Sequence, residues 1–262
     1  MNILQQIIAK KRVEVEGKKG VVSIRDLESM PLFKKETLSL CKSLADETKT
    51  GIIAEYKRKS PSKGIINNTA TVEEVTAAYT EWGASGISVL TDTHFFGGSL
   101  EDLERAAINK IPLLRKDFMI DEYQVLEAKA YGADVILLIA ANLSPQEVKH
   151  LAAAAKSLKL EVLLEVHNEE ELSHVCDEVD LVGVNNRNLK TFEVDINTSL
   201  QLIQKIPHGK VPITESGISD VQMIVTLKKA GFKGFLIGEN FMKHQQPAIA
   251  FANFVQALKA KE

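Results

Sequence analysis

The sequence has few of the residues that mark a disulfide framework or a metal site. Its two cysteines, Cys41 and Cys176, lie far apart and form no C-x-x-C pair. We therefore expect ordinary buried thiols in a reducing compartment. No cluster of histidines and carboxylates has the spacing of metal ligands, so no metal site is expected.

Long apolar runs and charge of one sign are also missing. The longest apolar run, Val135 to Ala141, is far shorter than the roughly 18 residues of a membrane span. The 32 basic and 35 acidic residues give a net charge of -3, and no half of the chain is strongly one-signed. We therefore expect neither nucleic acid nor a membrane as a partner. The first residues lack a secretory pattern, so a cytoplasmic protein is expected.

Short apolar, β-branched runs recur along the chain instead, and each has the composition of a buried strand. We count eight of them: Gly51-Glu55, Gly86-Leu90, Ile111-Leu114, Val135-Ala140, Val162-Val166, Leu181-Val184, Val211-Thr214 and Gly234-Ile237. Helical segments between them begin with capping patterns, at Thr71-x-x-Glu74, Ser99-x-x-Asp102, Ser144-Pro145-x-Glu147 and Asn168-x-x-Glu171. This alternation is typical of βα units and a parallel sheet.

Residues 1–47 precede the first strand and are interpreted as a helical extension packed on the strands and helices after it. Apolar residues from Ile3 to Ile8 have helical spacing, and the charged run Lys10-Lys11-Arg12 predicts a solvated far face. Ser23 with Asp26 resembles a capping pair, and Leu38 to Ala45 gives another helical pattern. The segment is too short to be a separate domain.

The chain is predicted to form one α/β domain, residues 1–262, with a closed (β/α)8 TIM barrel. Eight strands with intervening helices and no Gly-Ser or Pro-rich linker favour that fold. The alternative is an open, doubly wound sheet. A dinucleotide-binding version would need G-x-G-x-x-G after the first strand, where Glu55-Tyr56-Lys57-Arg58-Lys59 stands instead.

Ionisable residues collect at the predicted strand ends, which meet at the catalytic mouth of such a barrel. Glu55 and Lys57 are two residues apart, so a strand points both to the same side. The other strand ends supply Lys116, Glu165, Asn185, Arg187 and Glu215. Any one pair could be a structural salt bridge, but their convergence favours a site where protons are given and taken.

Several other features bear on that site. No Ser-His-Asp set is evident, and of the histidines only His94 and His167 lie near strand ends, where a lone loop histidine is more often solvated. Ser216-Gly217 and Gly238-Glu239 come after the last two strands, the place where many barrels hold phosphate. Phe96 and Phe118 add aromatic surface at the rim, either as ligand contacts or as core.

These residues resemble the indole-3-glycerol-phosphate synthase family of tryptophan biosynthesis, over nearly the whole chain and including the extension. The motifs that carry the resemblance are Glu55-x-Lys57-x-x-Ser60-Pro61-Ser62-Lys63-Gly64, Phe96-Gly97-Gly98-Ser99, Leu114-x-Lys116-Asp117-Phe118, Leu164-Glu165-Val166, Gly183-x-Asn185-x-Arg187-x-Leu189, Glu215-Ser216-Gly217-Ile218 and Ile237-Gly238.

The resemblance implies a cofactor-free lyase, a decarboxylase that closes the indole ring of 1-(2-carboxyphenylamino)-1-deoxyribulose 5-phosphate. It implies that Lys116 is the general acid, that Glu165 transfers protons with it, and that Glu55 assists. Lys57 would hold the substrate carboxylate or help in the dehydration. Substrate binding would fall to Ser60, Phe96, Phe118, Asn185, Arg187, Leu189, Glu215 and Ser216, and phosphate binding to Gly217, Gly238 and Glu239. Glu239-Asn240 stands where the family often has serine, which puts a hydroxyl contact there in doubt.

Two other functions stay open at this point. A phosphoribosylanthranilate isomerase or related sugar-phosphate isomerase has the same fold, but has less use for two lysines, Lys57 and Lys116. A noncatalytic sensor of a phosphorylated ligand would not need so many acid and base groups. We expect a monomer that acts on a phosphorylated small molecule and that associates, at most weakly, with other enzymes of the pathway.

Overall fold

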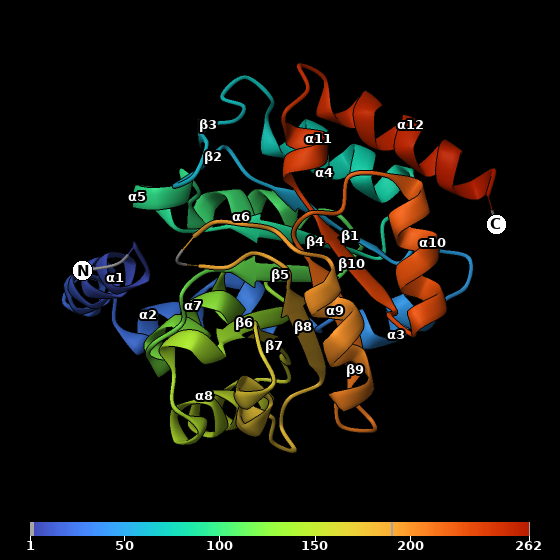
Figure 1. Cartoon of the computed structure of the whole chain (residues 1–262). Coiled ribbons are helices and arrows are strands. Elements are labelled where there is room, and N and C mark those ends of the chain that lie inside the picture. Colours follow the sequence, from blue (N-terminus) through green and yellow to red (C-terminus); the bar gives the residue numbers. More distant parts are fainter. Residues whose placement is uncertain (1–2, 190, 262) are drawn as a thin grey trace.

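Within the residues that this computed structural model describes, 3–189 and 191–261, eight parallel strands close into a barrel (Figure 1). Their order around the barrel is β1-β10-β9-β8-β7-β6-β5-β4. Their bounds are β1 Ile52–Tyr56, β4 Gly86–Leu90, β5 Leu113–Lys116, β6 Val135–Ile139, β7 Glu161–Val166, β8 Leu181–Asn185, β9 Val211–Glu215 and β10 Gly234–Ile237. The predicted (β/α)8 barrel is confirmed, and the open sheet is excluded because β1 pairs with both β4 and β10.

Helices surround the barrel and join its strands (Figure 1). The connecting helices are α4 Val72–Glu81, α5 Thr93–Phe96, α6 Leu100–Ala106, α7 Glu122–Ala130, α8 Pro145–Ser157, α9 Asn197–Leu202 and α10 Val221–Ala230, with 3-10 turns η2 Ala140–Asn142, η3 Glu170–His174 and η4 Ile203–Lys205. Two further helices, α11 Glu239–Met242 and α12 Pro247–Lys259, follow the last strand. A small hairpin, β2 Lys59–Ser60 with β3 Gly64–Ile65, comes after β1. The hairpin is formed by the segment that the sequence predicts as a basic loop.

Most predicted strands agree with the observed ones to within one residue at each end, but two predicted elements differ more. The third strand begins and ends two residues later than expected, at Leu113 and Lys116, because its ladder with β4 continues to the pair Leu90 and Lys116. The capping contact between Asn168 and Glu171 forms, but only the 3-10 turn η3 is built on it. The connection there is short, and the Glu171 carboxylate accepts the backbone N–H of His167 instead of facing solvent.

The extension consists of α1 Ile3–Lys19, α2 Ile24–Ser29, η1 Pro31–Lys34 and α3 Leu40–Ala45. Helix α3 closes the N-terminal end of the barrel, where Leu40 and Leu44 join the apolar residues of the barrel interior. Gly86 permits this contact, because a Cβ there would lie 2.7 Å from Cδ1 of Leu40. Burial of these side chains holds the extension against the N-terminal end of the barrel.

Helices α1 and α2 lie against α7 on the side of the barrel (Figure 1). Val15 and Leu27 pack there against Tyr123, whose hydroxyl donates to the Val22 carbonyl at 2.9 Å. The predicted capping box at Ser23 is present. The predicted solvated face of α1 is wrong at Lys11, which is 1% exposed.

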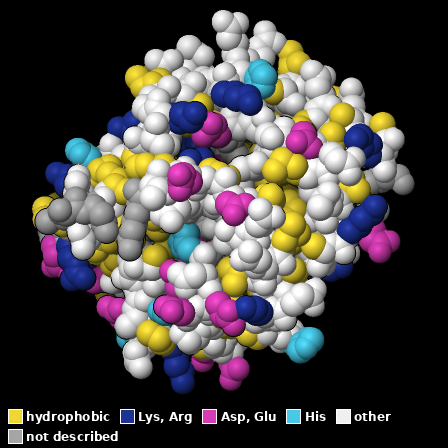
Figure 2. All heavy atoms as spheres, in the orientation of Figure 1, with side chains coloured by type: hydrophobic (Ala, Val, Ile, Leu, Met, Phe, Trp, Pro, Cys, Tyr) yellow, Lys and Arg dark blue, Asp and Glu magenta, His cyan; other side chains and the backbone are white. Residues whose placement is uncertain are grey.

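Several other predictions about the surface can be compared with the structure. Cys41 and Cys176 are free thiols. Both were expected to be buried, but the structure has them half-buried. Basic and acidic side chains are interspersed over the face shown in Figure 2. Across the described part of the chain, no helix has the length and apolar character needed to cross a membrane.

Candidate active site

A cavity of about 280 Å³ opens at the C-terminal ends of the barrel strands. All of the residues predicted for the site line it: Glu55, Lys57, Ser60, Phe96, Lys116, Phe118, Glu165, Asn185, Arg187, Leu189, Glu215, Ser216, Gly217, Gly238 and Glu239. The structure thus brings together residues from every part of the barrel, because parallel strands place all their carboxyl ends at one face. Their individual roles stay predictions.

Lys116 lies at the centre of the charged group. It is the last residue of β5, and its ammonium donates to Oε2 of Glu165 at 2.8 Å and to Oε2 of Glu215 at 2.7 Å. Burial alone would lower the pKa of Lys116, but the carboxylates of Glu165 and Glu215 raise it above its ordinary value. Lys116 therefore carries a positive charge in the free site.

The two glutamates that share Lys116 titrate differently. Burial raises the pKa of Glu215 to about 7, and the neighbouring charge of Glu165 adds to that rise while Lys116 opposes it. Burial also favours the neutral form of Glu165, but Lys116 and then His167 hold its pKa below the ordinary value. A site with one firmly ionised carboxylate and one that titrates near neutrality has both a proton acceptor and a proton reservoir.

Gly183 on β8 makes room for Glu215. A Cβ at position 183 would collide with Oε1 of Glu215, so a side chain there would displace the carboxylate. This oxygen is buried and has no hydrogen-bond partner among the described residues. An unpaired buried carboxylate oxygen is costly, which marks Oε1 as a group available to a ligand.

His167 contacts the charged group, although the sequence favours a solvated loop histidine there. Its Nε2 lies 3.3 Å from Oε1 of Glu165, and its Nδ1 lies 3.2 Å from Oε2 of Glu171. Burial would lower the pKa of His167, but these two carboxylates raise it to about 10. The imidazole is therefore charged at neutral pH. The expectation of a solvated loop histidine holds for the exposed His94 only.

Glu55, on β1, and Lys57, directly after it, form the predicted pair. Nζ of Lys57 lies 2.8 Å from Oε1 of Glu55, and both line the cavity. Gly238 faces this carboxylate closely enough that a Cβ would collide with it. The glycine is therefore needed for Glu55 as well as for any approach of backbone to a ligand.

The loops after β9 and β10 have the backbone expected for an anion site. Ser216 and Gly217 have positive φ angles of 67° and 78°, and the short helix α11 starts directly after Gly238. Arg187 reaches this side of the cavity, with Nη2 3.8 Å from Oε2 of Glu239. Backbone N–H groups at such a turn and at a helix start favour an anion, while the Glu239 carboxylate occupies part of the rim.

Apolar surface completes the cavity. The rings of Phe96 and Phe118 have centroids 6.1 Å apart, and Leu189 also lines the cavity. The sequence reasoning missed Ile3, Leu4 and Ile7, which reach the cavity from α1. Their helical spacing predicted an apolar face, but no local pattern says which part of the barrel that face meets.

The charged side chains at the centre of the cavity pair lysine with glutamate: Lys57 with Glu55, and Lys116 with Glu165 and Glu215. In residues 3–189 and 191–261, no group of three or more His, Cys, Asp or Glu side chains has an arrangement suited to a metal ion.

A closed (β/α)8 barrel with lysine–glutamate pairs at its strand ends defines an enzyme of the TIM-barrel class. Comparison with solved structures agrees on the fold: a mutant tryptophan synthase alpha-subunit from Pyrococcus furiosus has a TM-score of 0.62 at 15% identity, covering 81% of this chain and 99% of its own.

Sequence comparison identifies the family. The family model described as indole-3-glycerol phosphate synthase matches residues 4–254. The indole-3-glycerol phosphate synthase of Bacteroides thetaiotaomicron is 47% identical over 259 residues, with 98% of this chain and 99% of the relative covered. That of Salinibacter ruber is 43% identical over 256 residues, with 96% and 94% covered. The chain belongs to the indole-3-glycerol phosphate synthase family, as its motifs predict.

Proposed function

We propose that this chain is a carboxy-lyase that converts 1-(2-carboxyphenylamino)-1-deoxyribulose 5-phosphate into indole-3-glycerol phosphate, with release of carbon dioxide and water. The observation that carries the proposal is the position of Lys116, whose charged ammonium lies between Glu165 and Glu215 inside the cavity. Ring closure places negative charge on the ketose carbonyl oxygen. A buried ammonium is a suitable donor to that oxygen.

The steps can be assigned to groups in the cavity. As the ring carbon that bears the carboxylate attacks the carbonyl carbon, Lys116 gives a proton to the carbonyl oxygen. The carboxylate then leaves as carbon dioxide, and its bonding electrons restore the aromatic ring. Loss of the new hydroxyl as water needs one proton on that oxygen and the removal of another from the ring system. Glu165, with Glu55 assisting, is the group proposed to move these protons.

Binding is proposed to match the division of the cavity into a polar and an apolar side. Lys57 meets the substrate carboxylate, and Phe96 and Phe118 pack its aromatic ring. Gly217, Gly238 and Glu239 offer backbone N–H groups to the phosphate, and further contacts come from Ser60, Asn185, Arg187, Leu189, Glu215 and Ser216. The phosphate contact rests on backbone groups, so it does not require a serine at position 239.

The test is a fluorescence assay for the indole product, with a Lys116→Ala variant beside the parent. Turnover by the parent and loss in the variant is the expected result. If neither protein acts, phosphoribosylanthranilate is the substrate to test next, since an isomerase would act on it. Turnover of that substrate alone would overturn the proposal.

We further propose a cytoplasmic monomer. Support comes from the cavity, which is complete within one chain, and from the two free cysteines, which suit a reducing compartment. Sedimentation analysis and cell fractionation test these two points, and a stable oligomer or an exported protein would contradict them.

A further inference from the structure

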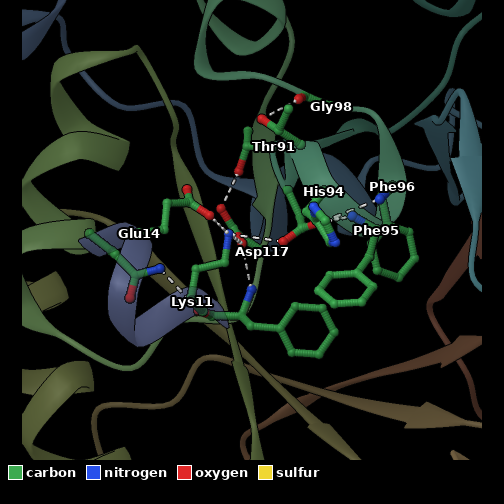
Figure 3. A network of polar contacts seen from close by, with 12 residues as sticks. Lys11, Glu14, Thr91, His94, Phe95, Phe96, Gly98 and Asp117 are labelled. Carbon is green, nitrogen blue, oxygen red and sulfur yellow. Dashed lines mark hydrogen bonds and ion pairs between the residues drawn. The ribbon is translucent and has the colours of Figure 1, made fainter. Parts of the chain in front are cut away.

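A buried lysine of the extension joins two strand-end loops of the barrel. The ammonium of Lys11, on α1, lies 3.0 Å from Oδ2 of Asp92 and 3.0 Å from Oδ1 of Asp117 (Figure 3). Glu14 completes its surroundings, with Oε2 at 2.9 Å. Both aspartates are buried, like the lysine. A charge is buried at this depth only where its partners compensate it, so the three groups hold one another in place.

Each aspartate also fixes the backbone beside an aromatic residue of the cavity. Oδ1 of Asp92 caps α5 and accepts the N–H of Phe96 at 3.3 Å. Oδ1 of Asp117 accepts the N–H of Phe118 at 2.8 Å. A single carboxylate therefore connects the ammonium of Lys11 to the backbone N–H of each phenylalanine. Figure 3 shows Lys11 directed from α1 toward Asp117.

One of the two loops that Lys11 joins also lies next to Lys116. Asp117 directly follows Lys116, and its Oδ2 accepts from Oγ1 of Thr91 at 2.6 Å and from Nη2 of Arg115 at 3.1 Å. This second set of contacts ties Asp117 to the barrel without Lys11. Loss of Lys11 therefore removes the direct tie between Asp92 and Asp117, while the Thr91 contact and the end of β5 stay in place.

Helix α1 brings more than Lys11 to the site. Ile7 precedes Lys11 by one helical turn on the same face, is buried, and lines the cavity. The pairing of Lys11 with the two aspartates therefore also fixes how far α1 reaches over the cavity.

We propose that Lys11 is a positioning residue that sets the spacing of Phe96 and Phe118, and so the fit of the aromatic ring of the substrate. The inference rests on the proposed function, because it takes the two phenylalanines as contacts of that ring. It assigns to one side chain of the extension a specific effect on substrate binding. A purely structural salt bridge would affect stability and leave the choice between ligands unchanged.

The test compares Lys11→Met with Lys18→Met. The first removes the buried charge and keeps an aliphatic side chain; the second is the matched control, because Lys18 is on the same helix but pairs with Glu14 and Glu127 on its flank. We expect Lys11→Met to raise KM about tenfold and to change kcat less than about threefold, since binding and not chemistry is altered. Lys18→Met is expected to keep the KM of the parent.

Binding titrations separate ring recognition from phosphate recognition. Indole-3-glycerol phosphate carries both groups, and glycerol 3-phosphate carries the phosphate without the ring. Lys11→Met is expected to weaken binding of the first about tenfold and of the second less than about twofold, because the phosphate loops lie after β9 and β10. Equal weakening of both ligands, or parent affinity for both, would overturn the proposal.

A second variant covers the case in which Lys11→Met is unstable. Lys11→Met/Asp92→Asn removes the unpaired carboxylate and keeps an amide oxygen able to cap α5. If Lys11 only stabilises the fold, restored stability would restore KM; a raised KM in a stable double variant supports positioning. The parent assay keeps the two proposals apart. Absence of turnover in the parent would count against the proposed function, whereas a change in ligand choice does not depend on turnover.

Discussion

Replacement of Lys116 by methionine tests the centre of the site most directly. Methionine keeps much of the volume of the lysine side chain and removes the charge that Glu165 and Glu215 share. Loss of a proton donor typically costs about 10²-fold to 10⁴-fold in rate. We expect kcat to fall within that range in the indole fluorescence assay.

The same substitution should make stability depend on pH. Removal of one partner of a buried ion pair costs about 3–5 kcal/mol when the other partner stays charged. In the parent, the pKa of Glu215 is already raised to about 7 in the folded protein. Without Lys116 it rises further, so the folded state binds a proton more readily than the unfolded state and stability falls as the pH rises. We expect Lys116→Met to lose about 3–5 kcal/mol at pH 9 and clearly less at pH 6.

Urea unfolding monitored by circular dichroism at both pH values measures this difference. The double variant Lys116→Met/Glu215→Gln also removes the carboxylate of Glu215, while Glu165 keeps its contact with His167. It should regain stability at pH 9 while its kcat stays low. A rate close to that of the parent, or a loss of stability that is independent of pH and unchanged in the double variant, would refute the reasoning.

Four other positions give further predictions. Since the ionised form of Glu215 is the one that holds Lys116, kcat/KM should rise with pH through about 7, and Glu215→Gln should remove this inflection. The pKa of His167 is raised to about 10, so the charged imidazole contributes its full stability below about pH 6.5, and this contribution is lost as the pH rises through 10. His167→Gln should therefore be less stable than the parent at low pH, and the difference in the free energy of unfolding should shrink as the pH rises over that range. Gly183→Ala should lower stability by about 1–3 kcal/mol and reduce turnover, because its Cβ collides with Glu215. Gly17→Ala, whose Cβ meets no atom within 4 Å beyond the backbone of its own helix, should stabilise α1 by about 0.5–1 kcal/mol, and thermal unfolding compares the two variants.

The sequence predicts most of the site because it depends on strand periodicity and barrel topology. Glu55 and Lys57 were placed on one side of a strand by the period of two, and the structure has them paired. Lys116, Glu165 and Glu215 are far apart in the chain. They meet because parallel strands in a closed barrel end at one face, which needs only the order of the elements.

The buried lysine of α1 shows where such reasoning stops. Lys11 belongs to a charged run and was expected to face solvent. It nevertheless falls in the same helical stripe as Ile7 and Val15, and all three are buried. This shared helical spacing could have predicted that Lys11 is buried. Its partners could not be predicted in the same way, because no periodicity relates α1 to Asp92 or Asp117.

The balance of charge in the cavity explains why the pKa of His167 matters and why the sequence does not predict its charge. The substrate brings a carboxylate and a phosphate, so a cavity with excess negative charge would repel it. Glu55, Glu165 and Glu215 would give such an excess over Lys57 and Lys116 alone. The charged imidazole of His167 and the raised pKa of Glu215 both reduce it. Each effect depends on burial and on neighbours from other strands, which a sequence pattern does not contain. The free site is thus prepared for an anion by groups whose charge is set by the fold.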